Sequence, residues 1–212
     1  MMKYKPQRKV QIKWSPKFAY AIGLLTADGS LSSDKRHIYF VSIDLELIRN
    51  LKLALILKNK ICERIKRDKK HFYIQFGDIM FYKFLNSIGL YSAKSKTIKK
   101  VTIPNKLFSD FLRGLFDGDG TFYSYWDKRW PNSFVYHIVF ASASFNFINW
   151  LKTRASNLYK VKGFIRKGDG VYILRYVKGD SRKLFNVMYY NKNILYLKRK
   201  YTKIKNAINM PS

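Results

Sequence analysis

The chain has 212 residues and 47% of them are hydrophobic, which is enough to bury the interior of one large domain or two smaller ones. Lys and Arg number 42 against 13 Asp and Glu, so the formal net charge is +29, spread along the whole chain. Such a charge repels itself in a free globule, whereas nucleic acid offers a dense line of phosphates. Nucleic acid is therefore the first partner to consider, although charge alone also fits a protein that coats ribosomal RNA or an anionic membrane.

Several classes of protein are disfavoured by composition. Cys62 is the only cysteine, so no intrachain disulfide can form, and His37, His71 and His137 lack the spacing of zinc ligands. The basic N-terminal segment has no apolar run typical of a secretory signal, and no segment has 18 uninterrupted apolar residues. We expect a soluble, intracellular protein that does not bind a membrane.

The chain contains the same order of segments twice. The first half reads, in order, AIGLLTADGS (21–30), RHIYFVSI (36–43), DLELIRNLKLALIL (44–57), ICERIK (61–66), HFYIQF (71–76) and GDIMFYKFLNSIGL (77–90). The second half reads LRGLFDGDGT (112–121), FVYHIVFASA (134–143), SFNFINWLKTRASNLY (144–159), GFIRKGDGVYILRYV (163–177) and GDSRKLFNVMYYN (179–191). An internal repeat changes the interpretation of the whole fold, because each copy then predicts one structural unit.

The spacing between matching residues grows slowly along the chain. It is 91 residues for Asp28 and Asp119, 100 for Ser42 and Ser142, and 102 for Gly77 and Gly179. Growth of this kind indicates loop insertions, the largest of which we place in YSYWDKRWPN at 123–132, between the first two strands of the second half.

Each unit is predicted to run helix, two strands, helix, two strands, helix. Alternation of Phe72, Ile74 and Phe76 with Tyr73 and Gln75 predicts a strand, and KGDG at 167–170 predicts a hairpin turn. Helices are predicted from apolar residues at a period of 3.6, with plausible N-caps at Asp44, Asp78, Ser144 and either Asp180 or Ser181.

The predicted fold class is α/β, with two pseudo-symmetric αββαββα halves. We place the first half at 1–91, a connecting segment at 92–108 and the second half at 109–212. Pro104 marks a break just before the first helix of the second half. Helical aromatic residues such as Phe81, Phe84 and Trp150 are expected in the core.

Both opening helices carry small residues four positions apart. Gly23 with Ala27, and Gly114 with Gly118, give each helix a flat stripe, so we expect the two helices to pack closely against each other. We expect the next glycines, Gly29 and Gly120, to take positive φ angles and end the helices.

The aspartates at these helix ends oppose the helix dipole. A carboxylate at a helix C-terminus costs about 0.3 to 1 kcal/mol, so stability alone does not favour Asp28 and Asp119 at matching positions. Clustered carboxylates and terminal carbonyls do suit a hard divalent cation such as Mg²⁺. Asp117 has no acidic counterpart in the first half, where Thr26 occupies the matching position, so only the pair of Asp28 and Asp119 is symmetric.

AIGLLTADG (21–29) and LRGLFDGDG (112–120) resemble the paired signature of the LAGLIDADG homing endonucleases, and the repeated order resembles their single-chain form over almost the entire chain. The resemblance implies that the signature helices form the interface between the halves and that each half presents a curved antiparallel sheet to the DNA major groove. By position, Asp28 and Asp119 are the implied metal ligands, with help from the carbonyls of Ala27 and Gly118. Thr26 departs from the family pattern at a site that is usually structural.

The resemblance also implies an activity. A monomer would cut both strands of an asymmetric duplex target of about 20 base pairs, leaving 3′ overhangs, with Mg²⁺ or Mn²⁺ supporting cleavage and Ca²⁺ binding without it. Its gene would lie in an intron, encode an intein or stand alone, and the protein would act in a prokaryotic cytoplasm or, if encoded in an organelle intron, in that organelle.

Basic side chains near the scissile phosphates are a further expectation. The repeat indicates Lys94 and Lys198 as a catalytic pair, and Lys96, Lys100 and Lys200 compete for these roles. Polar and long side chains of the strands and hairpin loops are the candidates for reading DNA, namely Lys35, Arg36, Arg64, Lys66, Tyr73, Gln75, Tyr123, Tyr125, Lys128, Arg129, Arg166 and Arg175. We place Tyr123, Tyr125, Lys128 and Arg129 in the longer hairpin loop of the second half.

A second class of function stays open. The same fold could serve a protein that binds nucleic acid without cutting it, either an RNA splicing cofactor of a group I intron or a DNA-binding regulator. Intact carboxylates at both helix ends favour the nuclease.

Overall fold

The computed structural model describes residues 9–210, and the chain divides into two compact units. One unit consists of the residues up to Lys94 together with Val101–Gly118, and the other of Ser95–Lys100 together with the residues from Asp119 onward. No helix among residues 9–210 is long and apolar enough to cross a membrane.

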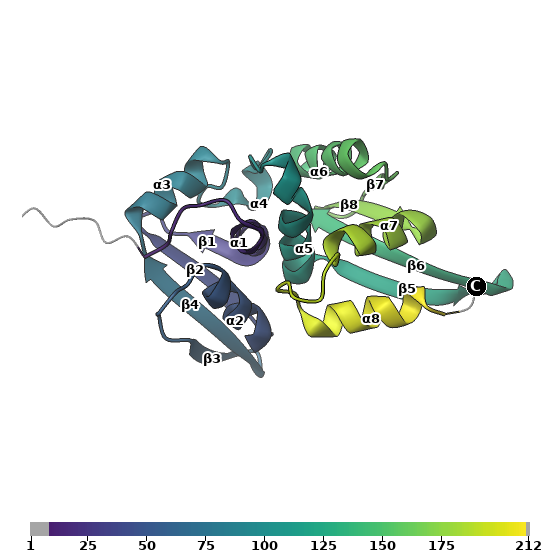
Figure 1. The fold of residues 1–212 in the computed structure, drawn as a ribbon, viewed down its shortest axis with the longest axis horizontal. Coiled ribbons are helices and arrows are strands. Elements are labelled where there is room, and N and C mark those ends of the chain that lie inside the picture. The colour runs from purple at the N-terminus through teal and green to yellow at the C-terminus, as the bar shows by residue number, and fades with distance from the viewer. Residues whose placement is uncertain (1–8, 211–212) are drawn as a thin grey trace, which may run out of the picture. The chain divides into compact units, whose positions relative to one another are not determined.

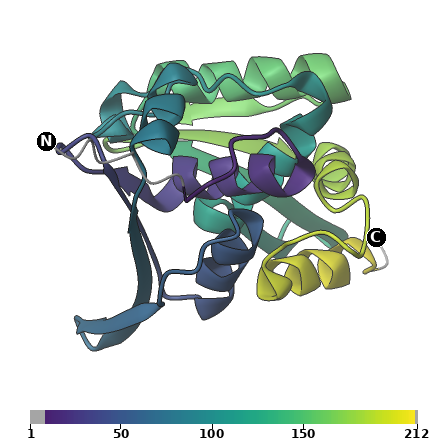
Figure 2. The same cartoon turned by 60° about the vertical axis from the view of Figure 1, so that its left-hand side comes forward.

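The first unit is built around a four-stranded antiparallel sheet, which we call sheet A, with strand order β1-β2-β4-β3. Its elements are α1 (Pro16–Asp28), β1 (Gly29–Leu31), β2 (His37–Ser42), α2 (Leu45–Ala54), β3 (Cys62–Lys66), β4 (Lys69–Gly77), α3 (Ile79–Ser87), η1 (Asn105–Leu107) and α5 (Phe108–Asp119), the last of which ends one residue beyond the unit. The short α4 (Lys94–Thr97) lies where the chain passes from one unit to the other. Helices α1, α2 and α3 contact sheet A, and the β3–β4 hairpin extends away from α2 (Figure 2).

The second unit contains a matching sheet, sheet B, with strand order β5-β6-β8-β7. Its elements are β5 (Thr121–Asp127), β6 (Trp130–Ser142), α6 (Phe145–Tyr159), β7 (Phe164–Lys167), β8 (Tyr172–Val177), α7 (Lys178–Met188) and α8 (Lys198–Ile208). Helices α6, α7 and α8 all contact this sheet (Figure 1). The predicted fold class is confirmed: two halves repeat one helix and strand order, and α8 follows the second half.

Local sequence signals explain where the helices begin. Ser15 caps α1 by accepting a hydrogen bond from the Phe18 amide at 3.2 Å, and Pro16 follows at the first helical position. Asp78 and Ser144 cap α3 and α6 in the same way, as predicted. Asp78 also accepts hydrogen bonds from the Lys9 and Val10 amides at 2.7 and 3.0 Å, which ties the N-terminal segment to α3.

The cap predicted for α7 is wrong. Helix α7 begins after Val177 without a side-chain cap. The Ser181 hydroxyl is fully buried, where it donates to the Tyr176 carbonyl at 2.7 Å and accepts from the Ile138 amide at 3.0 Å. It therefore joins α7 to both central strands of sheet B. The strand registers also correct the match for Gly77. His37 lies opposite Gly77 in sheet A, and His137 lies opposite Val177 in sheet B. Val177, and not Gly179, therefore occupies the position in the second half that corresponds to Gly77.

Two further expectations need correction. Gly29 has a φ of −74°, not the positive φ that we expected, and it is the first residue of β1. Its lack of a side chain matters for another reason, because a Cβ would lie 2.4 Å from the Leu25 carbonyl oxygen. The inserted stretch 123–132 is not a loop but lengthens β5 and β6, with a tight turn at Lys128 and Arg129. Tyr123 and Tyr125 therefore lie on strand β5.

Candidate active site and nucleic-acid interface

The two signature helices α1 and α5 pack with their backbones in contact. A Cβ on Gly23 would lie 2.2 Å from the Phe111 carbonyl oxygen, and a Cβ on Gly114 would lie 2.1 Å from the Tyr20 carbonyl oxygen. Only glycine fits at such distances. The predicted close approach of the two flat stripes, as far as Gly118, is confirmed.

A buried polar network crosses the same helix pair. Tyr20 of α1 donates a hydrogen bond to the Asp117 carboxylate of α5 at 2.9 Å, and Asn50 of α2 donates to the Tyr20 hydroxyl at 3.4 Å. Burial, and then the adjacent Asp117 charge, raise the pKa of Tyr20 well above its ordinary value, so the hydroxyl keeps its proton. Asp117 is fully buried and acts in helix packing, whereas Thr26 at the matching position bonds back to the Ile22 carbonyl at 2.7 Å.

Arg113 supplies the positive charge of this network. Its guanidinium donates to Asp110 at 2.7 Å, with both side chains at most 2% exposed, and lies 5.2 Å from the centre of the Tyr20 ring. A buried ion pair needs such additional partners to offset the loss of hydration. The network fixes the register of α1 against α5, and with it the placement of the helix ends.

Asp28 is the last residue of α1 and Asp119 is the last residue of α5. Asp28 is half-buried and Asp119 is exposed. The position of a Cβ on Gly118 would lie 3.2 Å from an Asp28 carboxylate oxygen and 2.5 Å from the Ala27 Cβ, so Asp28 lies directly against the residue that precedes Asp119. A side chain at position 118 would push this carboxylate away.

A lysine binds next to each of these aspartates. Lys94, at the start of α4, donates a hydrogen bond from Nζ to the carbonyl of Gly29, which follows Asp28. Lys200 of α8 donates from Nζ to the carbonyl of Gly120, which follows Asp119, at 2.6 Å. The residue that matches Lys94 is therefore Lys200, one of the alternatives that the sequence left open. Lys198 lies on the exposed first position of α8.

The residues at the helix ends fit a hard divalent cation that keeps part of its water shell. Among residues 9–210, no three His, Cys, Asp or Glu side chains are grouped so that they could hold a metal ion. Mg²⁺ is typically held by one or two carboxylates and completes its octahedron with water and phosphate oxygens. Each helix end by itself offers a carboxylate, of Asp28 or Asp119, and the preceding carbonyl, of Ala27 or Gly118, and both are oxygen ligands of the kind that Mg²⁺ binds.

Sheet A has one face that packs on helices and a second face, its outward face, that is polar. Directly opposed residues of neighbouring strands point to the same face, so the register assigns to it the polar residues His37, Tyr39, Arg64, Lys66, Tyr73 and Gln75, with Val41 and Cys62 on either side of Tyr73. Arg64 lies 5.8 Å from the ring centres of both Tyr39 and Tyr73. The structure thus brings four predicted DNA-reading residues of the first half onto one surface, and adds Tyr39.

Sheet B has a different outward face. Its register places the predicted Tyr123, Tyr125, Arg166 and Arg175 on this face, together with a set of apolar and weakly polar residues that the sequence analysis did not select, namely Val135, His137, Val139, Ala141, Ile173 and Val177. Residues 136–140 of β6 are buried on both faces of the sheet, so this part of the sequence shows no clear alternation of polar and apolar residues. Only the strand register separates its core positions from its outward ones.

The four remaining predicted DNA-contact residues lie in the hairpin turns. Lys35 and Arg36 lie in the exposed turn between β1 and β2, where the Asp34 carboxylate accepts hydrogen bonds from His37 and lowers its own pKa in doing so. Lys128 and Arg129 form the exposed turn between β5 and β6. Arg129 pairs with Asp127 at 3.2 Å, and this contact lowers the pKa of the Asp127 carboxyl.

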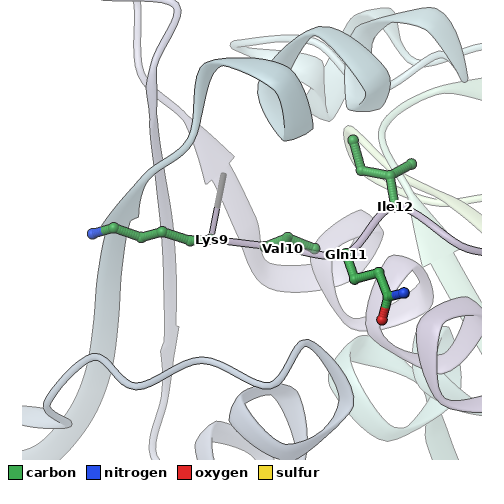
Figure 3. Close-up of a pocket in the computed structure, with 4 residues that line it drawn as sticks. All are labelled: Lys9, Val10, Gln11 and Ile12. Carbon is green, nitrogen blue, oxygen red and sulfur yellow. The ribbon is translucent and has the colours of Figure 1, made fainter. Parts of the chain in front are cut away.

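A cavity of about 480 Å³ is lined by Lys9, Val10, Gln11 and Ile12. Figure 3 shows the Lys9, Gln11 and Ile12 side chains pointing in different directions. A binding site for a small molecule needs polar groups that converge, so this cavity offers none of the chemistry that the helix ends offer.

Several solved structures share this fold. The LAGLIDADG homing endonuclease I-LtrWI bound to target DNA has 12% identity and a TM-score of 0.62, over 92% of this chain and 90% of its own. A mesophilic variant of the homing endonuclease I-DmoI has 16% identity and a TM-score of 0.57, over 90% and 97%. Full-length DUF199/WhiA from Thermatoga maritima has 15% identity and a TM-score of 0.59; the match covers 93% of this chain but 62% of WhiA. No protein-family model matches the sequence, and no curated protein matches it.

Proposed function

From the LAGLIDADG fold that this chain shares with homing endonucleases, we propose that it is a sequence-specific, metal-dependent endonuclease that cuts both strands of a DNA duplex. The observation that carries the proposal is the duplicated helix end. In each half, the signature helix finishes with an aspartate and a glycine, and a lysine ammonium holds the carbonyl of that glycine. A protein that only binds nucleic acid has no need for two such ends.

The paired ends suit cleavage of two strands. In this proposal, Asp28 and Asp119 bind divalent cations, and the carbonyls of Ala27 and Gly118 complete the protein ligands. Bound Mg²⁺ or Mn²⁺ would supply an activated water and stabilise the leaving 3′ oxygen. The carboxylates would hold the cations against the scissile phosphates, while Lys94 and Lys200, next to the helix ends, would stabilise the negative charge that develops on the phosphate oxygens.

The fold neighbours support this chemistry. I-DmoI was crystallised in complex with DNA and Mn, and in complex with DNA and Ca, while I-LtrWI was solved bound to its target DNA. For this chain we infer the same class of ligand: a long, asymmetric duplex target of about 20 base pairs, cut with 3′ overhangs by a monomer whose two halves each read one half-site.

The outward faces of the sheets supply the candidate readers. Arg64, Lys66 and Gln75 on sheet A, and Arg166 and Arg175 on sheet B, carry the long polar groups that hydrogen-bond to base edges. The turn residues Lys35, Arg36 and Lys128 add phosphate contacts. With a net charge of +29, binding falls steeply as salt rises.

A cleavage selection on a randomised or genomic duplex library tests the proposal. We expect breaks at one recurring site in Mg²⁺, and none in EDTA or with the Asp119→Asn variant. Binding without breaks would overturn the nuclease and favour the non-cleaving alternative, and group I intron RNA would then be the next substrate. An absence of any sequence preference would overturn specific recognition as well.

A further inference from the structure

The outward face of sheet B differs in chemistry from that of sheet A. Its central row runs from Thr121 on β5 through Val139 on β6 and Arg175 on β8 to Phe164 on β7. Val139 is only 8% exposed, whereas Phe164 at the edge of the same row is 65% exposed. The face is therefore apolar at its centre and open at its edge.

Aromatic rings surround this centre. The ring centres of Tyr123 and His137 lie 4.7 Å apart, and that of Tyr125 lies 6.0 Å from His137. Burial, followed by the charge of Arg175, lowers the pKa of His137, so the imidazole adds no charge to the face near neutral pH.

Charge restricts what can cover this apolar surface. Arg166 and Arg175 both lie at outward positions of sheet B, and the carboxylate of Asp127 at the far end of β5 is paired with Arg129. Arg175 is held 5.7 Å from the centre of the Tyr123 ring. A polyanion with apolar groups among its polar ones matches such a face, and a basic or purely polar partner does not.

In DNA, the apolar group of the major groove is the 5-methyl group of thymine. We propose that the outward face of sheet B reads thymine methyl groups, with the exposed Ala141 and the half-buried Ile173 as the contacting side chains and Arg175 as the neighbouring reader of a guanine. The half-site under sheet B is then rich in thymine. Sheet A, with Arg64, Lys66 and Gln75, reads its half-site through hydrogen bonds that do not involve the methyl group.

This inference rests on the DNA binding of the proposed function and does not need cleavage. Its test is therefore a binding experiment with the selected target in Ca²⁺. Each thymine of each half-site is replaced, one at a time, by deoxyuridine, which keeps base pairing and removes only the methyl group. A buried methyl contributes about fourfold to affinity.

The single cysteine assigns the half-sites. Cys62 is half-buried on β3 and opposes Tyr73 on the outward face of sheet A, so an iron chelate attached to it cleaves the DNA nearest to sheet A. The other half-site is then the one under sheet B. Binding curves of the labelled and the unlabelled protein are compared to show whether the chelate itself weakens DNA binding.

We expect deoxyuridine to weaken binding about fourfold per contacted position in the sheet B half-site, and to have little effect in the sheet A half-site. Ile173→Thr, which replaces apolar surface on this face by a hydroxyl, should lower affinity for the thymine target and reduce the penalty for deoxyuridine. The matched variant on sheet A, Val41→Thr, should leave both values unchanged. Specific binding that ignores deoxyuridine in both half-sites would overturn the inference but not the proposed function, whereas unspecific binding would overturn both.

Discussion

Lys200 donates a hydrogen bond from Nζ to the carbonyl oxygen of Gly120 at 2.6 Å, directly after Asp119. Lys94 makes the same contact with Gly29 after Asp28, although the two lysines come from helices of different length and position in their halves. The two halves thus converge on one arrangement of an acidic and a basic side chain at each helix end.

The carboxylates are expected to be required for cleavage and dispensable for binding. Asp28→Asn or Asp119→Asn keeps the shape of the side chain but removes the charge that a divalent cation needs. Double-strand cleavage should fall below detection, while the affinity for the target stays within a fewfold of wild type. Parallel cleavage and gel-shift assays check this; a variant that cuts at the wild-type rate would contradict the metal assignment.

The lysine next to one helix end should act on one strand. Lys200→Met removes the ammonium beside Asp119, and we expect one strand to be cut about 10² to 10³ times more slowly, so that nicked duplex accumulates. Strand-specific end labels on a denaturing gel measure this. Lys198→Met is the matched control two residues away on the same helix. If nicked duplex accumulates with this variant and not with Lys200→Met, the pair of Lys94 and Lys198 that the sequence repeat indicates would be favoured.

The carboxylates and the helix contact could be recognised from the sequence because both are local signals. Gly23 and Ala27, like Gly114 and Gly118, are separated by one helical turn, so their shared face follows from the period of the helix. The lysine was harder, because Lys200 reaches Gly120 from α8, and the lengths of the intervening loops and helices decide which turn of α8 faces that carbonyl.

Sheet B shows a second limit of sequence-based prediction. Val139 and Ile138 are both buried, so the alternation that separates the faces of an ordinary strand is lost in β6. The sequence therefore indicated Arg175 as an outward residue but did not show that Val139, directly opposite it, belongs to the same face. The positive φ expected for Gly29 failed for another reason, since this glycine serves the close approach to Leu25 and not a left-handed turn.

The contact between the signature helices should not tolerate a methyl group. In Gly23→Ala, the added Cβ would lie 2.2 Å from the Phe111 carbonyl oxygen, so α1 and α5 must separate. We expect a loss of about 1 to 3 kcal/mol in the free energy of unfolding. Gly179→Ala in α7 is the control, because no atom lies within 4 Å of its Cβ position and alanine favours a helix by about 0.5 to 1 kcal/mol. Urea denaturation of both variants measures the difference, and equal stabilities would contradict the close contact.

Removal of the hydroxyl should change the free energy of unfolding differently at two buried tyrosines. Tyr20→Phe leaves the buried Asp117 carboxylate without the hydrogen bond from α1, and we expect a loss of about 1 to 3 kcal/mol. Tyr176 is 1% exposed, and its hydroxyl has no hydrogen-bond partner within residues 9–210, so Tyr176→Phe should leave stability unchanged or raise it. Thermal unfolding compares the two, and a larger cost at position 176 would show that the Tyr20 network contributes little.

His137 should make stability depend on pH below about 6.5. Burial, and then the charge of Arg175, lower its pKa in the folded chain relative to the unfolded value of about 6.5. The rings of Tyr123 and Tyr125 and the guanidinium of Arg175 surround it, and a hydrogen bond with the Tyr176 backbone raises the pKa by less than burial and Arg175 lower it. As pH falls, this residue therefore binds a proton in the unfolded state before it does so in the folded state. The free energy of unfolding is highest above about pH 6.5 and decreases as pH approaches the lowered pKa of folded His137. The contribution of this one residue between pH 7.5 and 5.5 is at most about 1.4 kcal/mol.

His137→Phe removes the titrating group and should reduce the difference in the free energy of unfolding between these two pH values by the same amount, as measured by urea denaturation. An equally steep loss in the variant would assign the pH dependence to other groups, and a curve for the wild type that rises toward pH 5.5 would show that the folded state stabilises the imidazolium.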